Sequence, residues 1–397
     1  MTDAVLGFLA GDALVGIVAF QAVVLLVVLS NAVLLARPGR DRAGAPTPLV
    51  SLLVPARNEE ANVGGCVRSL LAQTYPHLEV VVLDDRSEDG TRAILERERA
   101  AATAAGDDRL VVRSGEEPPA GWTGKNWACH QLALAARGEV LLFADADTVF
   151  VDPDAVGGIV RALQASRADL LSGLPRQLLG TPGEALLVPM VYWALLSFTP
   201  LALARVWRRA PIARAVGQLM AFRRDAYEAI GGHAAVRGSV VDDIDLARSV
   251  ASARLAWHLL DATSIVTCRM YRSGREAAAG FARNLFAAFG SAILPFAFVW
   301  GWLAYAVLGP VAVGALHLAW PARVPVEPGW LLATIALSVA HWALVYGRLR
   351  LPIWIALLYP VTFAAFLAVA IRSFLDGVRR QTTWKGRALE RPPTRWI

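Results

Sequence analysis

The sequence is short of charged residues and of cysteines, and both shortages narrow its class. Charged residues make up 18% of 397 residues, whereas soluble globular domains average about a quarter. The three cysteines, Cys66, Cys129 and Cys268, are widely spaced and form no CxxC pattern, so the sequence predicts neither a disulfide framework nor a zinc site. Hydrophobic residues reach 56%, which excludes a disordered chain, a collagen and a coiled coil. The composition indicates a membrane protein with a sizeable water-facing part.

Positive charge is concentrated at the C-terminus. Residues 372–397 hold seven basic and two acidic side chains, which accounts for +5 of the formal net charge of +6. The near balance elsewhere argues against a nucleic-acid-binding protein, which would carry a broad basic face. A basic tail after an apolar segment fits contact with anionic lipid headgroups, or a solvated tail that obeys the positive-inside rule.

An uncharged run near the N-terminus, Ala13–Ala36, predicts a transmembrane helix within residues 1–36. Its 24 residues would reach roughly 36 Å as a helix, enough to cross a bilayer with some tilt. The length of the run, and two aspartates before it in place of a basic segment, argue against a signal peptide. Arginines follow in the linker predicted over residues 37–48, so we expect the chain after Arg37 to lie in the cytoplasm.

Residues 285–371 are expected to hold the C-terminal transmembrane helices. The uncharged runs in this part, each long enough to span, are Asn284–Ala322, Pro328–Gly347 and Leu351–Ile371. An even number of spans would keep the basic tail in the cytoplasm and an odd number would place it outside, so an even number is predicted.

A further uncharged run, Ala185–Ala204, is predicted not to cross the membrane. A single crossing there would separate two acidic motifs that we expect to share one site. An in-plane or re-entrant segment at the membrane interface and a buried core helix are the two remaining interpretations.

Residues 49–284 have the pattern of an α/β domain. Short apolar runs typical of buried strands are Leu49–Val54, Glu79–Leu83, Arg109–Val112 and Glu139–Ala144. Stretches with helical spacing lie between them. This alternation predicts a mostly parallel, Rossmann-like sheet covered by helices on both faces, with the ligand beyond the carboxyl ends of its strands.

Aspartates stand at two of those strand ends. Asp84 and Asp85 follow the second predicted strand, and Asp145 and Asp147 follow the fourth. Aspartate alone more often caps a turn. Two carboxylates one residue apart beyond a buried strand can instead hold Mg²⁺ or Mn²⁺ through hard oxygen ligands. Because Mg²⁺ is usually shared between a few carboxylates and substrate phosphates, the pattern suggests a diphosphate ligand.

Five ordered motifs resemble those of family 2 glycosyltransferases with the GT-A fold. They are VSLLVPARNEE (50–60), VVVLDDRSEDGT (80–91), Gly124-Lys125, ARGEVLLFADADT (136–148) and VVDDIDLA (240–247). One span before this domain and several after it resemble the membrane-bound members that glycosylate lipids. The segments GWTGKNWA (121–128), RMYRSGREAAAGFARNLF (269–286) and TWKGR (383–387) are similar to bacterial enzymes associated with carotenoid or hopanoid glycosylation.

The resemblance implies roles for individual residues. A nucleotide-sugar site would be formed by Pro55, Arg57, Glu59, Asp84, Asp85, Lys125, Asp145, Arg269 and Arg272. Asp145 and Asp147 would hold the Mg²⁺ or Mn²⁺ cofactor that bridges the diphosphate. Asp243 would be the catalytic base, and Asp242 stands where the family usually has glutamate.

The predicted protein is therefore a multi-pass inner-membrane, metal-dependent, inverting glycosyltransferase whose domain faces the cytoplasm. Its partners would be a nucleotide-sugar donor, with a UDP-sugar favoured, and a membrane lipid acceptor with a hydroxyl or carboxyl group, such as a carotenoid or hopanoid. Two alternatives are weighed. A processive polysaccharide synthase is disfavoured because the chain has no Q-x-x-R-W string, and an inactive scaffold is disfavoured because the family's acidic positions are all filled.

Overall fold

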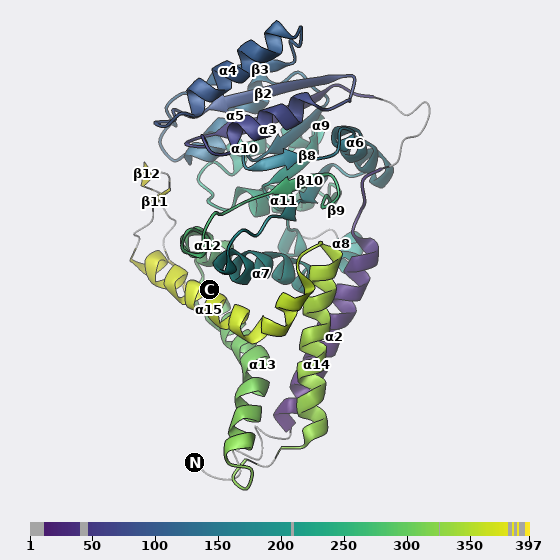
Figure 1. The fold of residues 1–397 in the computed structure, drawn as a ribbon, viewed down its shortest axis with the longest axis vertical. Helices are drawn as coiled ribbons and strands as arrows, with labels where there is room; N and C mark the ends of the chain where they lie inside the picture. The colour runs from purple at the N-terminus through teal and green to yellow at the C-terminus, as the bar shows by residue number, and fades with distance from the viewer. Residues whose placement is uncertain are drawn as a thin grey trace.

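The structure is a computed structural model that describes residues 12–39, 47–207, 210–324, 326–379, 383–384, 387–388 and 394–397. A sheet-bearing domain lies above a set of apolar helices in Figure 1. Two helices lie between these layers, α7 (Pro182–Phe198) and α12 (Gly274–Ala288).

In the described part of the chain the main sheet has seven strands in the order β3-β2-β1-β4-β8-β6-β9. Their bounds are β1 (Val50–Ala56), β2 (Leu78–Asp84), β3 (Leu110–Ser114), β4 (Val140–Ala144), β6 (Leu170–Leu174), β8 (Leu219–Arg223) and β9 (Trp257–Asp261). Strand β8 is antiparallel to both of its neighbours, and the other pairs in this sheet are parallel. The predicted α/β domain with a mostly parallel sheet is confirmed.

Helices cover both faces of this sheet. They are α3 (Val63–Leu71), α4 (Thr91–Ala104), α5 (Gly124–Ala135), α6 (Ala155–Ser166), α9 (Arg224–Ala229), α10 (Gly232–Ala235) and α11 (Asp242–Ser252). Because strand side chains alternate between faces, Leu52 and Val54 pack with residues of α3 and α6, whereas Leu53 and Phe143 point the other way. The cluster on this second face continues through α7 and α12 into the apolar helices. The domain and the apolar helices therefore share one hydrophobic core.

A smaller sheet joins β5 (Thr148–Phe150), β10 (Val266–Cys268) and β7 (Arg176–Gln177). Strands β5 and β10 are antiparallel, so the residues that flank them meet. The backbone N–H of Arg269 donates to the carbonyl oxygen of Asp147 at 3.3 Å. Two predicted site residues that are far apart in the sequence are thus neighbours.

Among the described residues, four helices are long and apolar enough to cross a membrane. They are α2 (Asp12–Leu34), α13 (Ile293–Ala319), α14 (Pro328–Arg348), and the 3₁₀ helix η2 (Ile353–Leu358) continued by α15 (Tyr359–Val378). Helices α2, α13 and α14 stand upright below the domain in Figure 1.

A buried chain of hydrogen bonds joins the upright helices to α7. The indole N–H of Trp193 donates to His341 Nδ1 at 3.0 Å, and His341 Nε2 lies 2.7 Å from Gln21 Oε1. The amide of Gln21 in turn donates to the carbonyl of Ala306 at 3.2 Å. Since Nδ1 accepts, Nε2 carries the imidazole proton and donates it to Gln21. Polar side chains that bond across helices in this way hold apolar helices in register.

The apolar run predicted not to cross forms two helices, α7 and α8 (Leu201–Trp207), bent by 53° at the break between them. Asn31 of α2 holds this break. Its amide nitrogen donates to the carbonyls of Leu196 and Thr199 at 2.7 and 2.8 Å, and its carbonyl accepts from the N–H of Leu201 at 3.0 Å. The backbone groups that the break frees are thereby satisfied by one side chain.

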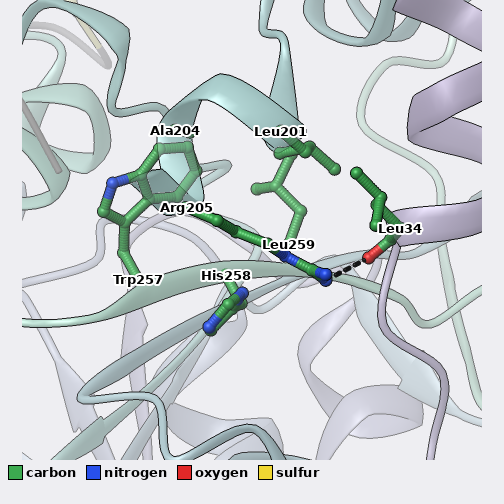
Figure 2. A pocket seen from close by; sticks show the side chains of 7 residues that line it. All are labelled: Leu34, Leu201, Ala204, Arg205, Trp257, His258 and Leu259. Carbon is green, nitrogen blue, oxygen red and sulfur yellow. Dashed lines mark hydrogen bonds between the residues drawn. The ribbon is translucent and has the colours of Figure 1, made fainter. Parts of the chain in front are cut away.

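The end of α2 is tied to both α8 and the sheet. Figure 2 shows Arg205 of α8 donating to the carbonyl of Leu34 at 2.7 Å beside a cavity of only about 10 Å³. This carbonyl is one of the groups that a helix end leaves without an internal partner. Two residues later Ala36 bridges to Leu260 of β9 in parallel register. The chain therefore passes directly from an apolar helix to the sheet.

Both ends of the segment formed by η2 and α15 lie beside the domain. Before it, Arg348 at the end of α14 forms an ion pair with Asp261 of β9. Near its C-terminal end, Ser373 Oγ accepts a hydrogen bond from the backbone N–H of Phe286 in α12 at 3.0 Å. In Figure 1 the segment dips between the upright helices and returns. Helix α13 leads away from the domain, and α14 leads back to it.

Reporter fusions test this path. With green fluorescent protein, which is active inside the cell, or alkaline phosphatase, which is active outside, fusions after Arg350 and Ile397 should report the same side. A fusion after Arg323, in the loop between α13 and α14, should report the opposite side. If the C-terminal fusion behaved like the one after Arg323, α15 would cross the membrane and the arrangement described above would be wrong.

Candidate active site

The predicted site residues gather around one cavity of about 1480 Å³ at the carboxyl ends of β1 and β4. Those that line it are Pro55, Arg57, Glu59, Asp85, Lys125, Asp145, Asp147, Asp242, Asp243, Arg269 and Arg272. Asp84 does not line it. Its side chain instead accepts a hydrogen bond from the backbone N–H of Ser87 at 3.2 Å, which holds the turn after β2.

Lys125 and Asp145 form an ion pair across the cavity wall. Lys125 lies in the first turn of α5, which begins where the hydroxyl of Thr123 accepts from the backbone N–H of Asn126. Its Nζ is 2.9 Å from Asp145 Oδ1. Burial alone would lower the pKa of Lys125, but the charges of Asp145 and Asp242 raise it well above its ordinary value. The lysine is therefore a fixed positive charge at the strand ends.

Asp147 is the residue best suited to a cation. Its Oδ1 is shielded from solvent and has no hydrogen-bond partner among the described residues. Burial raises the pKa of Asp147 to about 7, and the nearby carboxylates of Asp145 and Glu59 add to the shift. A cation would relieve both the desolvation and the repulsion.

The donor set around Asp147 fits a shared metal ion. In the described residues no group of three acidic, histidine or cysteine side chains could enclose a metal by itself. Asp145 and Asp147 offer only carboxylate oxygens, which suit Mg²⁺ or Mn²⁺ when substrate phosphates complete the coordination. The residues present therefore fit the metal site that the sequence predicts.

Asp243 has the features of a proton acceptor. In the first turn of α11, its Oδ2 accepts from the backbone N–H of Gly217 at 2.9 Å and its Oδ1 from that of Ile244 at 2.8 Å. Burial and the neighbouring Asp242 raise the pKa of Asp243 to about 7, while Lys125 opposes the shift. A base is most effective when its pKa lies near the working pH.

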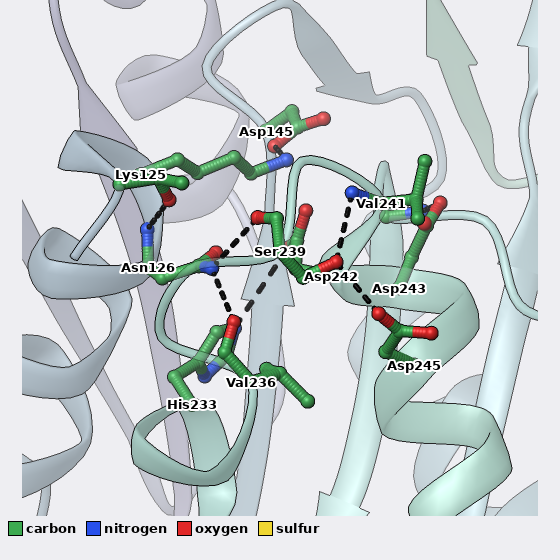
Figure 3. A network of polar contacts seen from close by, with 12 residues as sticks. Lys125, Asn126, Asp145, His233, Val236, Ser239, Val241, Asp242, Asp243 and Asp245 are labelled. Atoms are coloured by element: carbon green, nitrogen blue, oxygen red, sulfur yellow. Dashed lines mark hydrogen bonds and ion pairs between the residues drawn. The ribbon is translucent and has the colours of Figure 1, made fainter. Parts of the chain in front are cut away.

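A buried amide fixes the loop that presents Asp242 and Asp243 (Figure 3). The fully buried Asn126 donates from Nδ2 to the carbonyls of Val236, Arg237 and Ser239 at 2.8, 3.1 and 2.9 Å. The first turn of α5 is thereby bound to the segment that enters α11. This role was not predicted from the sequence, although Asn126 follows Gly124-Lys125 directly.

His233 is a second neighbour of the acidic pair that was not predicted from the sequence. Its Nε2 is 4.0 Å from Asp242 Oδ2, and its Nδ1 lies 2.7 Å from the hydroxyl of Tyr227. Burial lowers the pKa of His233 to about 3, and Lys125 adds to this decrease. The imidazole is therefore neutral at physiological pH and packs beside Asp242 without neutralising it.

Arg269 is bound to the helix that separates the domain from the apolar helices. Its guanidinium lies 3.2 Å from the fully buried Glu184 in the first turn of α7. Burial would raise the pKa of Glu184, but hydrogen bonds from Gly180 and Arg269 lower it, so the carboxylate is charged. Arg269 lines the cavity while it also fixes the start of α7.

The other two predicted arginines also bind protein groups. Arg57 Nη1 donates to the carbonyls of Asp85 and Arg86 at 2.7 and 2.9 Å. Arg272 Nη2 donates to Asn62 Oδ1 at 2.6 Å. Both arginines line the cavity while they fix the backbone and side chains at its rim.

The cavity extends beyond the polar residues into the apolar helices. Its lining there comes from α7, α12, α13 and α15. The large side chains in this part are Met190, Trp193, Phe198, Phe281, Phe289, Trp300, Leu303 and Phe366. Charged groups at the strand ends and aromatic groups between the helices therefore belong to one continuous space.

Comparison with known proteins agrees with this architecture. The model of the family described as "Glycosyl transferase family 2" matches residues 51–231. The match covers 181 of the 397 residues, a little under half of the chain. A 4,4'-diaponeurosporenoate glycosyltransferase of Staphylococcus aureus is 27% identical over 229 residues, which is 57% of this chain and 57% of that protein. The chain thus matches little more than half the length of this curated relative.

The fold of nearly the whole chain is found in a solved structure. The mannosyltransferase PcManGT from Pyrobaculum calidifontis, in complex with GDP-Man and Mn²⁺, superposes with a TM-score of 0.55. The match covers 94% of this chain and 99% of that one at 21% identity. The predicted GT-A fold is confirmed, with candidate apolar helices before and after the sheet-bearing domain.

Asn126→Asp tests the importance of the buried amide. A carboxylate there would face three carbonyl oxygens, so the free energy of unfolding should fall by about 1–3 kcal/mol or more. Thermal unfolding of the purified protein in detergent measures the change as a lower melting temperature. The matched control is Gln131→Glu in the same helix, where the amide donates to a single carbonyl, that of Trp127 at 3.3 Å, and the oxygen accepts from the backbone N–H of Glu116, so a much smaller change is expected. Equal melting of Asn126→Asp and the parent would contradict the role assigned to this amide.

Proposed function

We propose that the protein is a membrane-bound inverting glycosyltransferase that transfers a sugar from a nucleoside-diphosphate donor to a membrane lipid. The observation that carries this proposal is the single cavity that joins acidic and basic residues at the strand ends to aromatic residues between the apolar helices. Its volume of about 1480 Å³ exceeds the ~300–1,000 Å³ typical of a pocket for one small ligand. The space suits a polar donor and an apolar acceptor together.

The donor would lie at the polar end of the cavity. Lys125 places a fixed positive charge there, and Asp145 and Asp147 are the residues that would hold Mg²⁺ or Mn²⁺. When bound, the ion supplies Lewis-acid stabilisation of the departing nucleoside diphosphate. The PcManGT structure is a complex with GDP-Man and Mn²⁺, which supports a nucleotide-sugar donor with a divalent ion. A UDP-sugar remains the donor favoured by the sequence.

Asp243 would act as the base. An inverting transfer needs a group that takes the proton of the acceptor hydroxyl as its oxygen attacks the anomeric carbon. The backbone N–H groups of Gly217 and Ile244 orient the carboxylate of Asp243, and burial together with Asp242 keeps its pKa near neutrality. An acceptor bound against the aromatic lining would displace water, which would otherwise compete with it as nucleophile.

The acceptor would enter from the bilayer between the apolar helices. Trp193 of α7, Phe281 of α12, Trp300 of α13 and Phe366 of α15 line this part of the cavity. Such a lining favours a long apolar chain over a sugar polymer. The staphylococcal relative is a diaponeurosporenoate glycosyltransferase, which supports a carotenoid-type acceptor, and a hopanoid or another glycolipid precursor has the same apolar character.

The domain would face the cytoplasm of a bacterial inner membrane. Arginines stand at the helix ends that lie nearest the domain, with Arg37 just after α2, and Arg348 and Arg350 at the end of α14. Further basic residues follow α15 in the sequence. An excess of arginine marks the cytoplasmic side of membrane helices. In that orientation, α2, α13 and α14 would cross the bilayer, while α7, α12 and α15 would lie at its inner surface.

Transfer by the purified protein tests the function. With UDP- or GDP-sugar, Mn²⁺ and extracted membrane lipid, we expect a glycolipid with one added sugar and free nucleoside diphosphate. Asp243→Asn should lower kcat by about 10²–10⁴-fold while nucleotide binding is kept. In the parent, kcat/KM should rise with pH through about 7, since Asp243 must lose its proton to act as a base. The exposed control, Asp225→Asn, should leave the rate unchanged.

Three outcomes would count against this proposal. A long polysaccharide product would indicate a processive synthase. Absence of nucleotide release with every donor and lipid would indicate an inactive scaffold. Full activity of Asp243→Asn would remove the base from the mechanism.

Asp147→Asn tests the metal site. We expect UDP with Mn²⁺ to raise the melting temperature of the parent protein, because a ligand that binds only the folded state stabilises it. The variant should melt like the parent without ligand and lose most of the shift, whereas Asp108→Asn at an exposed position should keep it. A full shift in Asp147→Asn would show that the ion is held elsewhere.

A further inference from the structure

A buried glutamine between the predicted metal residues and the predicted base has no assigned role. Gln218, just before β8, is 4% exposed and lines the cavity. Its backbone carbonyl accepts from the N–H of Asp145 at 3.2 Å. The N–H of Gly217, the residue before it, donates to Asp243 at 2.9 Å. The backbone at this position therefore contacts one predicted metal residue and adjoins the contact that holds the predicted base.

The side chain of Gln218 extends toward the other predicted metal residue, Asp147, through Cys268. Gln218 Nε2 donates to Cys268 Sγ at 3.0 Å, so the thiol keeps its own proton for another acceptor. In the pairing of β10 with β5, Cys268 lies opposite Thr148, the residue after Asp147. Burial raises the pKa of Asp147, whereas a hydrogen bond from the thiol of Cys268 lowers it. The thiol thus links the amide of Gln218 to the carboxylate of Asp147.

Two further buried side chains fix the amide of Gln218 in one orientation. Its Oε1 accepts from Gln177 Nε2 at 2.9 Å and lies 3.2 Å from the hydroxyl of Tyr192. Gln177 Nε2 also donates to this hydroxyl at 2.7 Å. Gln177 and Tyr192 are 4% and 2% exposed, so water cannot readily replace these contacts. Because a buried polar group without a partner is costly, the amide cannot turn over and must present its N–H to Cys268.

This arrangement orients Asp147 and leaves it available for a ligand. Asp147 Oδ1 has no hydrogen-bond partner among the described residues. The thiol can therefore hold the carboxylate while this oxygen binds an ion. Residues that orient a metal ligand in this way typically contribute about 10–100-fold to the affinity for the metal.

We propose that Gln218 is a positioning residue of the predicted metal site, and that it orients the carboxylate of Asp147 through the thiol of Cys268. This inference rests on the proposed function and adds two residues to the site that bind neither the donor nor the acceptor. They act on the affinity for the ion and leave the metal-independent part of nucleotide binding unchanged.

Binding of radiolabelled UDP to the full-length protein in detergent tests the inference without any transfer reaction. The ratio of the dissociation constant in EDTA to that in Mn²⁺ is the metal gain. Gln218→Met keeps the length of the side chain and removes both hydrogen-bonding groups. Its metal gain should fall about tenfold or more, while its dissociation constant in EDTA should match that of the parent. An unchanged metal gain would overturn the inference. Weaker binding in EDTA would also overturn it, because Gln218 would then contact the nucleotide itself.

Two variants of Cys268 test the thiol independently of how well Gln218→Met folds. Cys268→Ala removes the group between the amide and the carboxylate, so it should lose the metal gain as Gln218→Met does. Cys268→Ser keeps a hydroxyl that can accept from Gln218 and donate to Asp147, so it should retain most of the gain. Equal behaviour of the alanine and serine variants would contradict the role of the thiol proton.

Gln73→Met is the matched control for loss of a buried glutamine. Gln73 is 3% exposed, and its amide donates to the carbonyls of Ser69 and Asp152 at 3.2 and 3.0 Å. It does not line the cavity. This variant should melt at a lower temperature than the parent and keep the full metal gain. If it lost the gain as Gln218→Met does, the effect would reflect lost stability, and the positioning role would be rejected.

The proposed function and this inference can fail separately. Absence of a metal gain in the parent, with UDP and with GDP, would reject the predicted metal site and the inference together. A metal gain in the parent that survives in Gln218→Met and Cys268→Ala would reject the inference alone. Neither result depends on whether a sugar is transferred.

Discussion

The shared hydrophobic core determines how the site is built. Leu53 and Phe143 of the sheet belong to the same cluster as Trp193 of α7 and Phe363 of α15. Burial of apolar surface is the main favourable term in folding, so the sheet cannot separate from the helices without exposing it. The strand ends that carry the aspartates are consequently fixed directly above an apolar layer, and charged and aromatic side chains line one space.

Polar contacts then define the geometry that the hydrophobic core leaves undetermined. Asn31 holds the bend between α7 and α8, Asp261 binds Arg348, and Asn126 ties α5 to the entrance of α11. Each contact lies at a junction between elements that are distant in the sequence. Hydrophobic packing brings these elements together without direction, whereas buried hydrogen bonds require a particular arrangement.

The sequence was most informative where local pattern determines structure. Continuous apolar runs predicted the parallel strands, and an aspartate directly after a strand end had to lie at the edge of the sheet. Pattern alone could not reveal the path of α15, because the uncharged run that ends at Ile371 has the length of a membrane span. Its return depends on tertiary contacts such as that of Ser373 with Phe286. Asn126 was missed for the same reason, since the carbonyls that it binds lie 110 to 113 residues away in the sequence. His233 was missed because only the folded structure shows that its imidazole is buried beside Tyr227 and Asp242.

The return of α15 has a consequence for the fate of the product. Trp342 and Tyr346 of α14 are fully buried, and Trp342 stacks on Trp193 of α7 with ring centroids 4.4 Å apart. A sugar cannot slip through hydrocarbon unaided, because its hydroxyl groups would lose their water. If the protein performs the proposed transfer, its glycolipid product would therefore stay in the leaflet that supplied the acceptor unless a separate flippase moved it.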